Sequence, residues 1–484
     1  FNHAESIRAF RHAAELDPQC AICHWGIALA HGPNINAPMD SAAGVAAYGA
    51  IQAARELSAD ASDVERGLID ALATRYLEVP PADRAGLDSA YARAMGELVE
   101  RYPDDLEVAT LHAEALMDLR PWQYWAEGGQ PQPGTEVILA NLERVIELNP
   151  RHPGACHFYI HAVEEVFPER ALPCAERLAA LMPGAGHIVH MPGHIYIRVG
   201  RYVDAIEANV HAAHADESYI QDLRPGAGIY TLGYYPHNYD FLAFAASMAG
   251  RRQQALEAAG KIPTLLPSEM LGTPGMDFMQ HHLTRPLQLA VRFARWDDVL
   301  ATTEPAGNLP HARAMWQYAR GRALLAGDDV AGAEAAVAAI REIRASSATE
   351  GMRLEFNQAR DVQGIAAEVL AAHIEAEKGN VDAAVQHFQE AARLEDGLVY
   401  GEPPEWTVPV RQEMGAVLLT AGRAAEAEQA YREDLERFPD NGWSLHGLSS
   451  ALRAQGRDAD ADESMVAYER AWEGADARDM MGGR

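Results

Sequence analysis

Residues 200–213 read GRYVDAIEANVHAA, and this stretch sets the pattern for much of the chain. The same pattern occurs again in GRRQQALEAA (250–259), GNVDAAVQHFQEAARLED (379–396) and GRAAEAEQAYREDLERFPDNGW (422–443). In each copy a glycine ends one helix and an alanine opens the apolar stripe of the next. Glycine suits a helix end because it adopts left-handed dihedral angles without strain. The pattern therefore predicts helices paired through tight turns.

The spacing of the marker alanines sets the period of this pattern. Ala171 to Ala205 is 34 residues, and Ala427 to Ala461 is also 34 residues. The step from Ala205 to Ala255 is longer, at 50 residues, which indicates an insertion. A 34-residue helix–turn–helix unit that buries its apolar face by stacking is typical of tetratricopeptide repeats. The chain resembles the tetratricopeptide-repeat superfamily over essentially its whole length, which implies an all-α solenoid with a concave ligand-binding face.

Five further segments narrow the resemblance. They are FNHAESIRAF, WGIALAHGPNINAP, LRPWQYW, HMPGHIYIRVGRY and EPPEWTVPVR. Together they resemble a group of bacterial solenoid proteins, and no activity comes with that resemblance.

Composition limits the classes of partner. Of 484 residues, 48% are hydrophobic, so the chain can bury a large core. Lys and Arg total 40 against 70 Asp and Glu, which gives a formal charge of −30. That field repels phosphates and anionic lipid surfaces, so we expect neither nucleic acid nor a membrane as partner. No apolar run approaches the roughly 20 residues that span a bilayer.

The chain is predicted to form one continuous solenoid in three parts. These are N-terminal helical hairpins (1–134), central His-rich tetratricopeptide-like repeats (135–344) and C-terminal tetratricopeptide-like repeats (345–484). The Pro-, Gly- and Trp-rich loop 120–134 is expected to be a structured insertion or a lid. The loop 397–407 is long enough to cover a groove.

Histidines gather in the middle of the chain. Residues 157–237 hold eight of the 20 histidines, where an even distribution would place about three. In a tetratricopeptide unit the first helix lines the concave wall, with positions 2, 5, 9 and 12 facing inward. Counting back from Ala205 or Ala255 as position 20 places His187, His190, His194 and His237 at these positions. Counting back from Ala171 adds His157 and His161 if the turn at Phe167–Pro168 is one residue shorter.

This arrangement predicts a transition-metal site. Residues four apart on a helix lie about 5–6 Å apart at Cβ, so two imidazoles can close on one ion with a third from the next helix. Six histidines could hold one ion or two. Histidine ligation favours Cu or Zn, with Fe as an alternative, over a carboxylate-rich di-iron site. The competing interpretation is a structural or pH-responsive histidine cluster.

Two prolines bear on this geometry. Pro192 and Gly193 interrupt HIVHMPGHIY, and a helix that began at Pro192 would leave His187 and His190 in a loop. We expect instead a kinked helix that continues through the proline. Pro236 is expected at the start of the helix that carries His237.

Neighbouring side chains are candidates for acid–base and substrate roles. Glu164 and Glu165 follow His161 by three and four residues, and Asp240 follows His237 by three, so these carboxylates are the predicted catalytic residues. For each candidate, ordinary packing or surface exposure is the alternative. The predicted substrate-binding residues are Tyr196, Arg198, Tyr234, Tyr235, Trp406 and Arg411.

The four cysteines are too few for a disulfide framework. CAICH (20–24) matches the C-x-x-C-H pattern of c-type haem attachment. Haem is not expected, because packing at the start of a repeat helix explains these residues. A metal or redox role for the C-x-x-C pair is a further alternative.

These observations lead to two functional hypotheses. The first is a metal-dependent oxidoreductase or hydrolase that acts on a small organic substrate. The second is a non-enzymatic scaffold that binds a peptide or protein partner, and a homo-oligomer is compatible with either. We expect the chain to be cytoplasmic, or exported if a signal sequence preceded residue 1, because the opening FNHAESIRAF looks like the second half of a hairpin.

Overall fold

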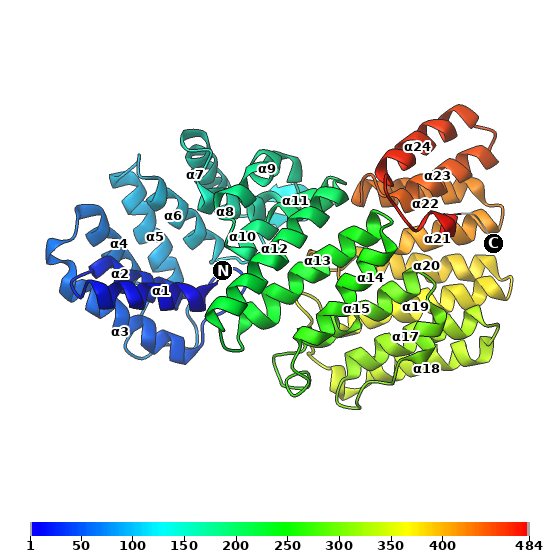
Figure 1. Ribbon diagram of the computed structural model, residues 1–484, viewed down its shortest axis with the longest axis horizontal. Helices are drawn as coiled ribbons and strands as arrows, with labels where there is room; N and C mark the ends of the chain where they lie inside the picture. The colour runs from blue at the N-terminus through cyan, green and yellow to red at the C-terminus, as the bar shows by residue number, and fades with distance from the viewer. Residues whose placement is uncertain (1, 482–484) are drawn as a thin grey trace. The chain divides into compact units, whose positions relative to one another are not determined.

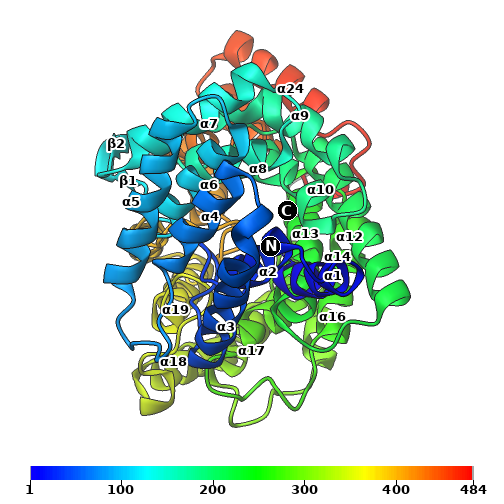
Figure 2. The same cartoon turned by 90° about the vertical axis from the view of Figure 1, so that its left-hand side faces the viewer.

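The structure, a computed structural model, describes residues 2–481 and is built from consecutive helices that pack in pairs (Figure 1). Within these residues the β structure amounts to isolated bridges and one two-stranded antiparallel sheet, β1 (Trp125–Ala126) with β2 (Gln130–Pro131), at the edge of the first unit (Figure 2). The predicted all-α, tetratricopeptide-like fold class is confirmed. No helix in the described range is long and apolar enough to cross a membrane.

The chain divides into two compact units, and the first ends at Pro183. Each helix of this unit packs mainly on its neighbours in sequence, as expected of stacked hairpins. Its helices are α1 (His3–Leu16), α2 (Ala21–Ala30), α3 (Ser41–Leu57), α4 (Asp63–Ala73), α5 (Ala85–Arg101), α6 (Leu106–Met117), α7 (Thr135–Leu148), α8 (Pro153–Val163) and α9 (Leu172–Leu181).

Capping and burial explain these first-unit helices. The Ser62 hydroxyl accepts from the Glu65 N–H while the Glu65 carboxylate accepts from the Ser62 N–H, a capping box that starts α4. Helices α2 to α6 share one hydrophobic core, in which Ile51, Leu72 and Met95 are fully buried. Burying such side chains is the main source of stability in a stacked array.

The second unit begins at Gly184 and repeats the same architecture. Its helices are α10 (Gly186–His190), α11 (Pro192–Arg198), α12 (Tyr202–Leu223), α13 (Tyr235–Met248), α14 (Arg252–Lys261), α15 (Phe278–Arg292), α16 (Trp296–Ala301), α17 (Pro310–Ala326), α18 (Val330–Ala345), α19 (Ala359–Glu377), α20 (Val381–Asp396), α21 (Val410–Thr420), α22 (Ala424–Arg437), α23 (Gly442–Ala454) and α24 (Asp458–Ala471).

The glycines of the repeated motif lie where the sequence predicts. Gly200, Gly250, Gly379 and Gly422 follow α11, α13, α19 and α21, and their φ angles lie between 67° and 79°. An L side chain rarely adopts this left-handed region, so glycine is required for the tight turn. The predicted helix–turn–helix pattern is confirmed at all four places.

The second unit also joins its early helices to its last hairpin. The indole N–H of Trp443 in α23 donates to the Ser247 carbonyl at 2.8 Å, and that of Trp472, after α24, donates to the Met248 carbonyl at 3.0 Å. Both carbonyls belong to the last turn of α13, where helices have unsatisfied acceptors. Gly250 accommodates this contact, since a Cβ there would lie 2.6 Å from the Trp472 ring.

The cysteines correct the expectation from their count. All four are paired, as Cys20–Cys23 and as Cys156–Cys174. The second bridge joins α8 to α9 inside the first unit and is buried. The predicted three-part division of the chain at 134/135 and 344/345 stays a prediction.

Candidate metal centre

Three predicted ligands lie together in the second unit: His190, His194 and His237, here called the histidine trio. Only Met191 separates α10 from α11, and its φ of −50° and ψ of −35° are helical. The chain therefore continues through Pro192 as a kinked helix, as predicted, and His190 and His194 keep a common face. Pro236 lies in the first turn of α13, which confirms its predicted place beside His237.

The spacing within the trio suits a metal ion. Nε2 of His190 lies 2.9 Å from Nε2 of His194. The His237 ring centroid lies 5.0 Å from that of His190 and 6.0 Å from that of His194. One ring nitrogen from each residue can be chosen so that all three lie within 4.8 Å of one another. A tetrahedral Zn–N site places neighbouring nitrogens about 3.3 Å apart, so small ring movements bring the trio to that size.

Asn209 and Glu402 lie against the outer nitrogens of two members of the trio. Asn209 Nδ2 donates to the Ala205 carbonyl at 2.8 Å, which turns its Oδ1 toward His190 Nδ1 at 2.7 Å. An amide oxygen only accepts, so His190 carries its proton on Nδ1. Nδ1 of His194 lies 3.1 Å from Oε2 of Glu402 in an ion pair without hydrogen-bond geometry, and the negative charge of the carboxylate favours a proton on that nitrogen.

The positions of these protons affect how the Nε2 atoms of His190 and His194 interact. With both Nδ1 atoms protonated, the Nε2 atoms of His190 and His194 turn unprotonated nitrogens toward each other at 2.9 Å. Two such nitrogens repel unless a cation lies between them, and the cation is either a metal ion or a proton. Metal-ligating histidines characteristically hold their other nitrogen against an oxygen acceptor in this way.

The wall behind the trio is apolar. The Phe241 ring lies 4.6 Å, centroid to centroid, from both His190 and His194 and 4.9 Å from His237. Burial lowers the pKa of His237 to about 4, so this imidazole is neutral at pH 7, as a metal ligand must be. Gly193 leaves room for Asn209, because a Cβ there would lie 2.7 Å from Asn209 Nδ2.

His187 lies beside the trio. It is buried, with its ring centroid 5.9 Å from that of His190 and 5.1 Å from that of Tyr234. Tyr234 belongs to a π-helical turn, residues 230–234, that leads into α13. Such turns are frequent at functional sites.

The other two predicted ligands belong to the first unit. His157 and His161 are buried on α8 with ring centroids 5.0 Å apart. Glu164 Oε1 lies 3.3 Å from His161 Nδ1, within the predicted reach, and Glu165 is half-buried. That these histidines share an ion with the trio stays a prediction.

The predicted catalytic residue Asp240 is engaged elsewhere in the second unit. Its Oδ1 lies 2.7 Å from Arg285 Nε, and its Oδ2 lies 3.5 Å from His282 Nδ1. Burial alone would raise the pKa of Asp240, but Arg285 and His282 outweigh it and lower the pKa. Asp240 is therefore a charged partner of two cations and is poorly suited to donate a proton.

His282 lies between two carboxylates. Its Nε2 is 3.1 Å from Glu355 Oε1, opposite Asp240. Burial lowers the pKa of His282, but the two carboxylates more than compensate and raise it to about 9. Glu355 also interacts electrostatically with His237, so this ion network adjoins the trio.

The predicted substrate-binding residues have different environments. Tyr196 is buried under the Arg201 guanidinium, 4.5 Å from the ring centroid. Tyr235 donates to Glu217 at 3.1 Å. Arg198 is 24% exposed and lies 3.7 Å from Oε1 of Glu402, which is a neighbour of the trio.

The last two predicted substrate-binding residues have structural contacts. Trp406 is 2% exposed and packs against Tyr318 in the core of the second unit. Arg411 binds Asp396 at 2.7 Å and Glu433 at 3.0 Å. A substrate-binding role for these two residues stays a prediction.

Sequence reasoning missed Glu402 and Asn209. Glu402 belongs to the 397–407 loop that was predicted to cover a groove, but it is 208 positions away from His194, so the sequence does not indicate the contact. Asn209 follows the marker Ala205 by one helical turn, and a buried Asn beside a histidine helix is the signal that could have identified it.

A small cavity of about 60 Å³ adjoins the trio through Glu402. Arg198 lies on its wall with the guanidinium 5.5 Å from the Tyr400 ring centroid, and Phe244 and Arg437 are among the other apolar and polar residues of the lining. The cavity is large enough for water or a small polar group.

The fold and the site together define a tetratricopeptide-like helical scaffold with buried histidine clusters that could bind metal. No protein-family model and no curated protein matches the sequence. Among solved structures, the chain is similar to the human IFIT1 dimer with m7Gppp-AAAA, at 12% identity, a TM-score of 0.36, and coverage of 93% of this chain and 89% of that one.

Two further solved structures show similar levels of likeness. The P58(IPK) TPR domain is 13% identical with a TM-score of 0.22, over 78% of this chain and 96% of that one. Yeast Tom70 is 12% identical with a TM-score of 0.28, over 81% and 92%. The ligands of these proteins carry no argument about this site.

Proposed function

We propose that the protein is a metal-dependent enzyme in which His190, His194 and His237 hold a Cu or Zn ion. One observation carries the proposal: two buried imidazoles face each other through Nε2 at 2.9 Å, while Asn209 Oδ1 accepts from His190 Nδ1 and the Glu402 carboxylate lies 3.1 Å from His194 Nδ1. This tautomer arrangement prepares both nitrogens to bind a cation.

Three histidine ligands leave a coordination position open. An ion held there supplies Lewis-acid activation of water or redox chemistry with dioxygen. Asn209 and Glu402 orient the two rings, and Phe241 keeps the inner side of the site dry. Arg198, on the wall of the adjoining cavity, is suited to hold an anionic group of a small organic substrate.

The remaining predicted residues have subordinate places in this proposal. His187, His157 and His161 are candidates for a second ion or for completing the first. Glu164 is the candidate to accept a proton from its imidazole neighbour, His161, or from a bound water.

Metal content of reconstituted protein tests the ligand set. The full chain is incubated with Zn²⁺ or Cu²⁺, dialysed and analysed for metal. We expect at least one equivalent, lost in His190→Ala and in His194→Ala, and retained in His211→Ala, which removes an exposed histidine of α12. An unmodified protein that retains no metal contradicts the proposal and leaves a proton as the shared cation.

Two further measurements resolve the finer claims. Loss of the same equivalent in His161→Ala supports the prediction that first-unit histidines share the ion, and its retention rejects that prediction. Dioxygen consumption with phenols and hydrolysis of activated esters are then followed with and without metal. Bound metal without turnover in either assay assigns storage or sensing in place of catalysis.

A further inference from the structure

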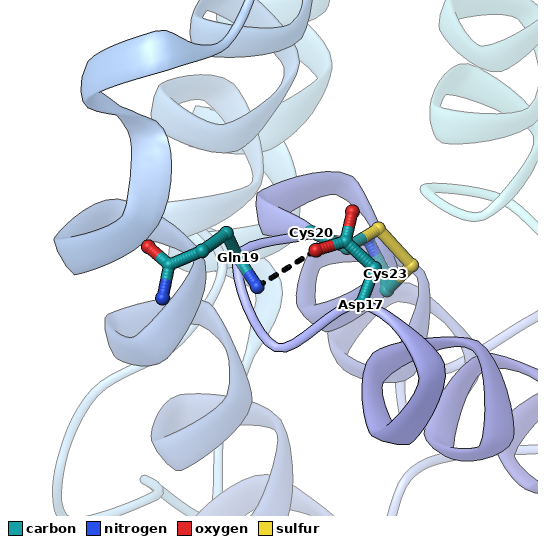
Figure 3. Close-up of a disulfide and its surroundings, with 4 residues drawn as sticks. All are labelled: Asp17, Gln19, Cys20 and Cys23. Carbon is teal, nitrogen blue, oxygen red and sulfur yellow. Dashed lines mark hydrogen bonds between the residues drawn. A yellow bond between two sulfur atoms is a disulfide. The ribbon is translucent and has the colours of Figure 1, made fainter.

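The first two cysteines lie at the start of one helix. Cys20 is the N-cap residue of α2, and Cys23 is its third residue. A disulfide joins them, with their Cα atoms 5.4 Å apart (Figure 3). The pair occupies a single helical turn in the first unit, away in sequence from every histidine of the proposed metal site.

This bridge ties no two elements together. It spans three positions within one turn, so it closes a very short loop and removes little entropy from the unfolded chain. The bridge between Cys156 and Cys174 differs, because it spans 18 positions and joins two helices. Only the second bridge has the geometry of a stabilising crosslink, which leaves the first without a structural task.

The two sulfurs of the short bridge differ in access. Cys20 is half-buried at the end of the turn Asp17–Gln19, whose three residues are all exposed. Cys23 is only 7% exposed. A thiolate arriving from solvent therefore reaches Cys20 before Cys23. In the second bridge both cysteines are buried, at 0% and 2% exposure.

The helix start also favours a thiolate on Cys20. The N–H of Cys23 donates to Cys20 Sγ at 3.2 Å, and the first turn of α2 carries no acidic residue. A helix N-terminus stabilises a negative sulfur, so Cys20 is a good leaving group when a mixed disulfide at this residue is resolved. The Asp17 carboxylate works against this effect, but it already accepts from the Gln19 N–H (Figure 3).

We propose that Cys20–Cys23 is a redox-active disulfide that exchanges with an external thiol. The thiolate of that thiol attacks Cys20 Sγ, a mixed disulfide forms at Cys20, and the Cys20–Cys23 bond breaks to leave a Cys23 thiolate. The thiolate of a second external thiol attacks the external sulfur of the mixed disulfide, the bond to Cys20 Sγ breaks to leave a Cys20 thiolate, and the two external thiols depart as a disulfide. The protein gains two electrons and two protons and holds Cys20 and Cys23 as thiols.

Differential reduction tests the site in the unmodified protein. The full chain is incubated with reduced glutathione, alkylated at timed intervals and mapped by mass spectrometry. We expect Cys20 and Cys23 to be alkylated at least tenfold faster than Cys156 and Cys174. Equal rates for the two pairs, or faster reduction of the second pair, overturn the proposal.

Single variants test which sulfur is attacked. Oxidised glutathione is offered to Cys23→Ser and to Cys20→Ser, with circular dichroism as the check on folding. A mixed disulfide on Cys20 in the first variant, with little on Cys23 in the second, supports the assignment. Preferential capture by Cys23 overturns it, and the alkylation rates of the unmodified protein stand if either variant fails to fold.

Discussion

Replacing Asn209 by leucine tests the tautomer argument directly. The substitution removes the acceptor that keeps the His190 proton on Nδ1. The proton is then free to move to Nε2 and to donate to His194 Nε2, only 2.9 Å away. The Nε2 atoms of both rings would then be engaged in that hydrogen bond and would not be available to bind metal. Loss of such an orienting partner weakens metal binding by roughly 10–100-fold, or about 1.4–2.7 kcal/mol.

The same substitution affects folding less than metal binding. It removes two buried hydrogen bonds, at 2.7 and 2.8 Å, each worth about 1 kcal/mol, and leucine restores part of the loss by burial. Zn²⁺ affinity is measured by competition with a chromophoric chelator, and thermal melting of the metal-free protein serves as the folding check. Asn380→Leu, on an exposed turn, is the matched control. Unchanged Zn²⁺ affinity in folded Asn209→Leu would show that the partner of Nδ1 does not prepare the site.

Three other predictions concern stability, each read from urea unfolding. His282 has a pKa of about 9 in the folded chain against 6.5 when unfolded, so its contribution is full below pH 6.5 and is lost as pH rises through 9. At 1.36 kcal/mol per pKa unit this contribution is ~3 kcal/mol. His282→Gln should flatten that part of the stability profile between pH 6 and pH 10, and an unchanged slope would contradict the ion network. Gly250→Ala should lower the free energy of unfolding by about 1–3 kcal/mol more than Gly379→Ala, because both glycines have positive φ but only the first would direct a Cβ into Trp472. Equal losses would show that the contact with Trp472 does not contribute. Cys156→Ser should cost about 3 kcal/mol by loss of the 18-residue crosslink, and a loss below 1 kcal/mol speaks against it.

Local signals made the repeat fold and part of the site predictable. Gly200 and Gly250 each mark a helix end because left-handed dihedral angles restrict the residue type there. The i,i+4 spacing of His190 and His194 likewise required only one continuous helical face, and the kink at Pro192 preserved it. Such features depend on residues within a turn or two of each other, and the sequence displays them directly.

Contacts between distant segments were not predictable. Glu402 reaches His194, and Trp443 reaches Ser247, across about 200 residues in each case. Their positions depend on how many small rotations accumulate along the array, which a period alone does not give. The C-x-x-C pair was considered as a haem attachment, but its sulfurs are bonded to each other and are not available for thioether links.

The two indole contacts at the end of α13 change how the second unit should come apart. In an open array each repeat contacts only its immediate neighbours, so the terminal repeats fray and the array can unfold in parts. Here the hairpin nearest the C-terminus caps the very helix on which His237 is carried. Removing the last hairpin should therefore loosen the proposed ligand His237, more than 200 positions upstream, and the second unit should unfold in a single step on heating.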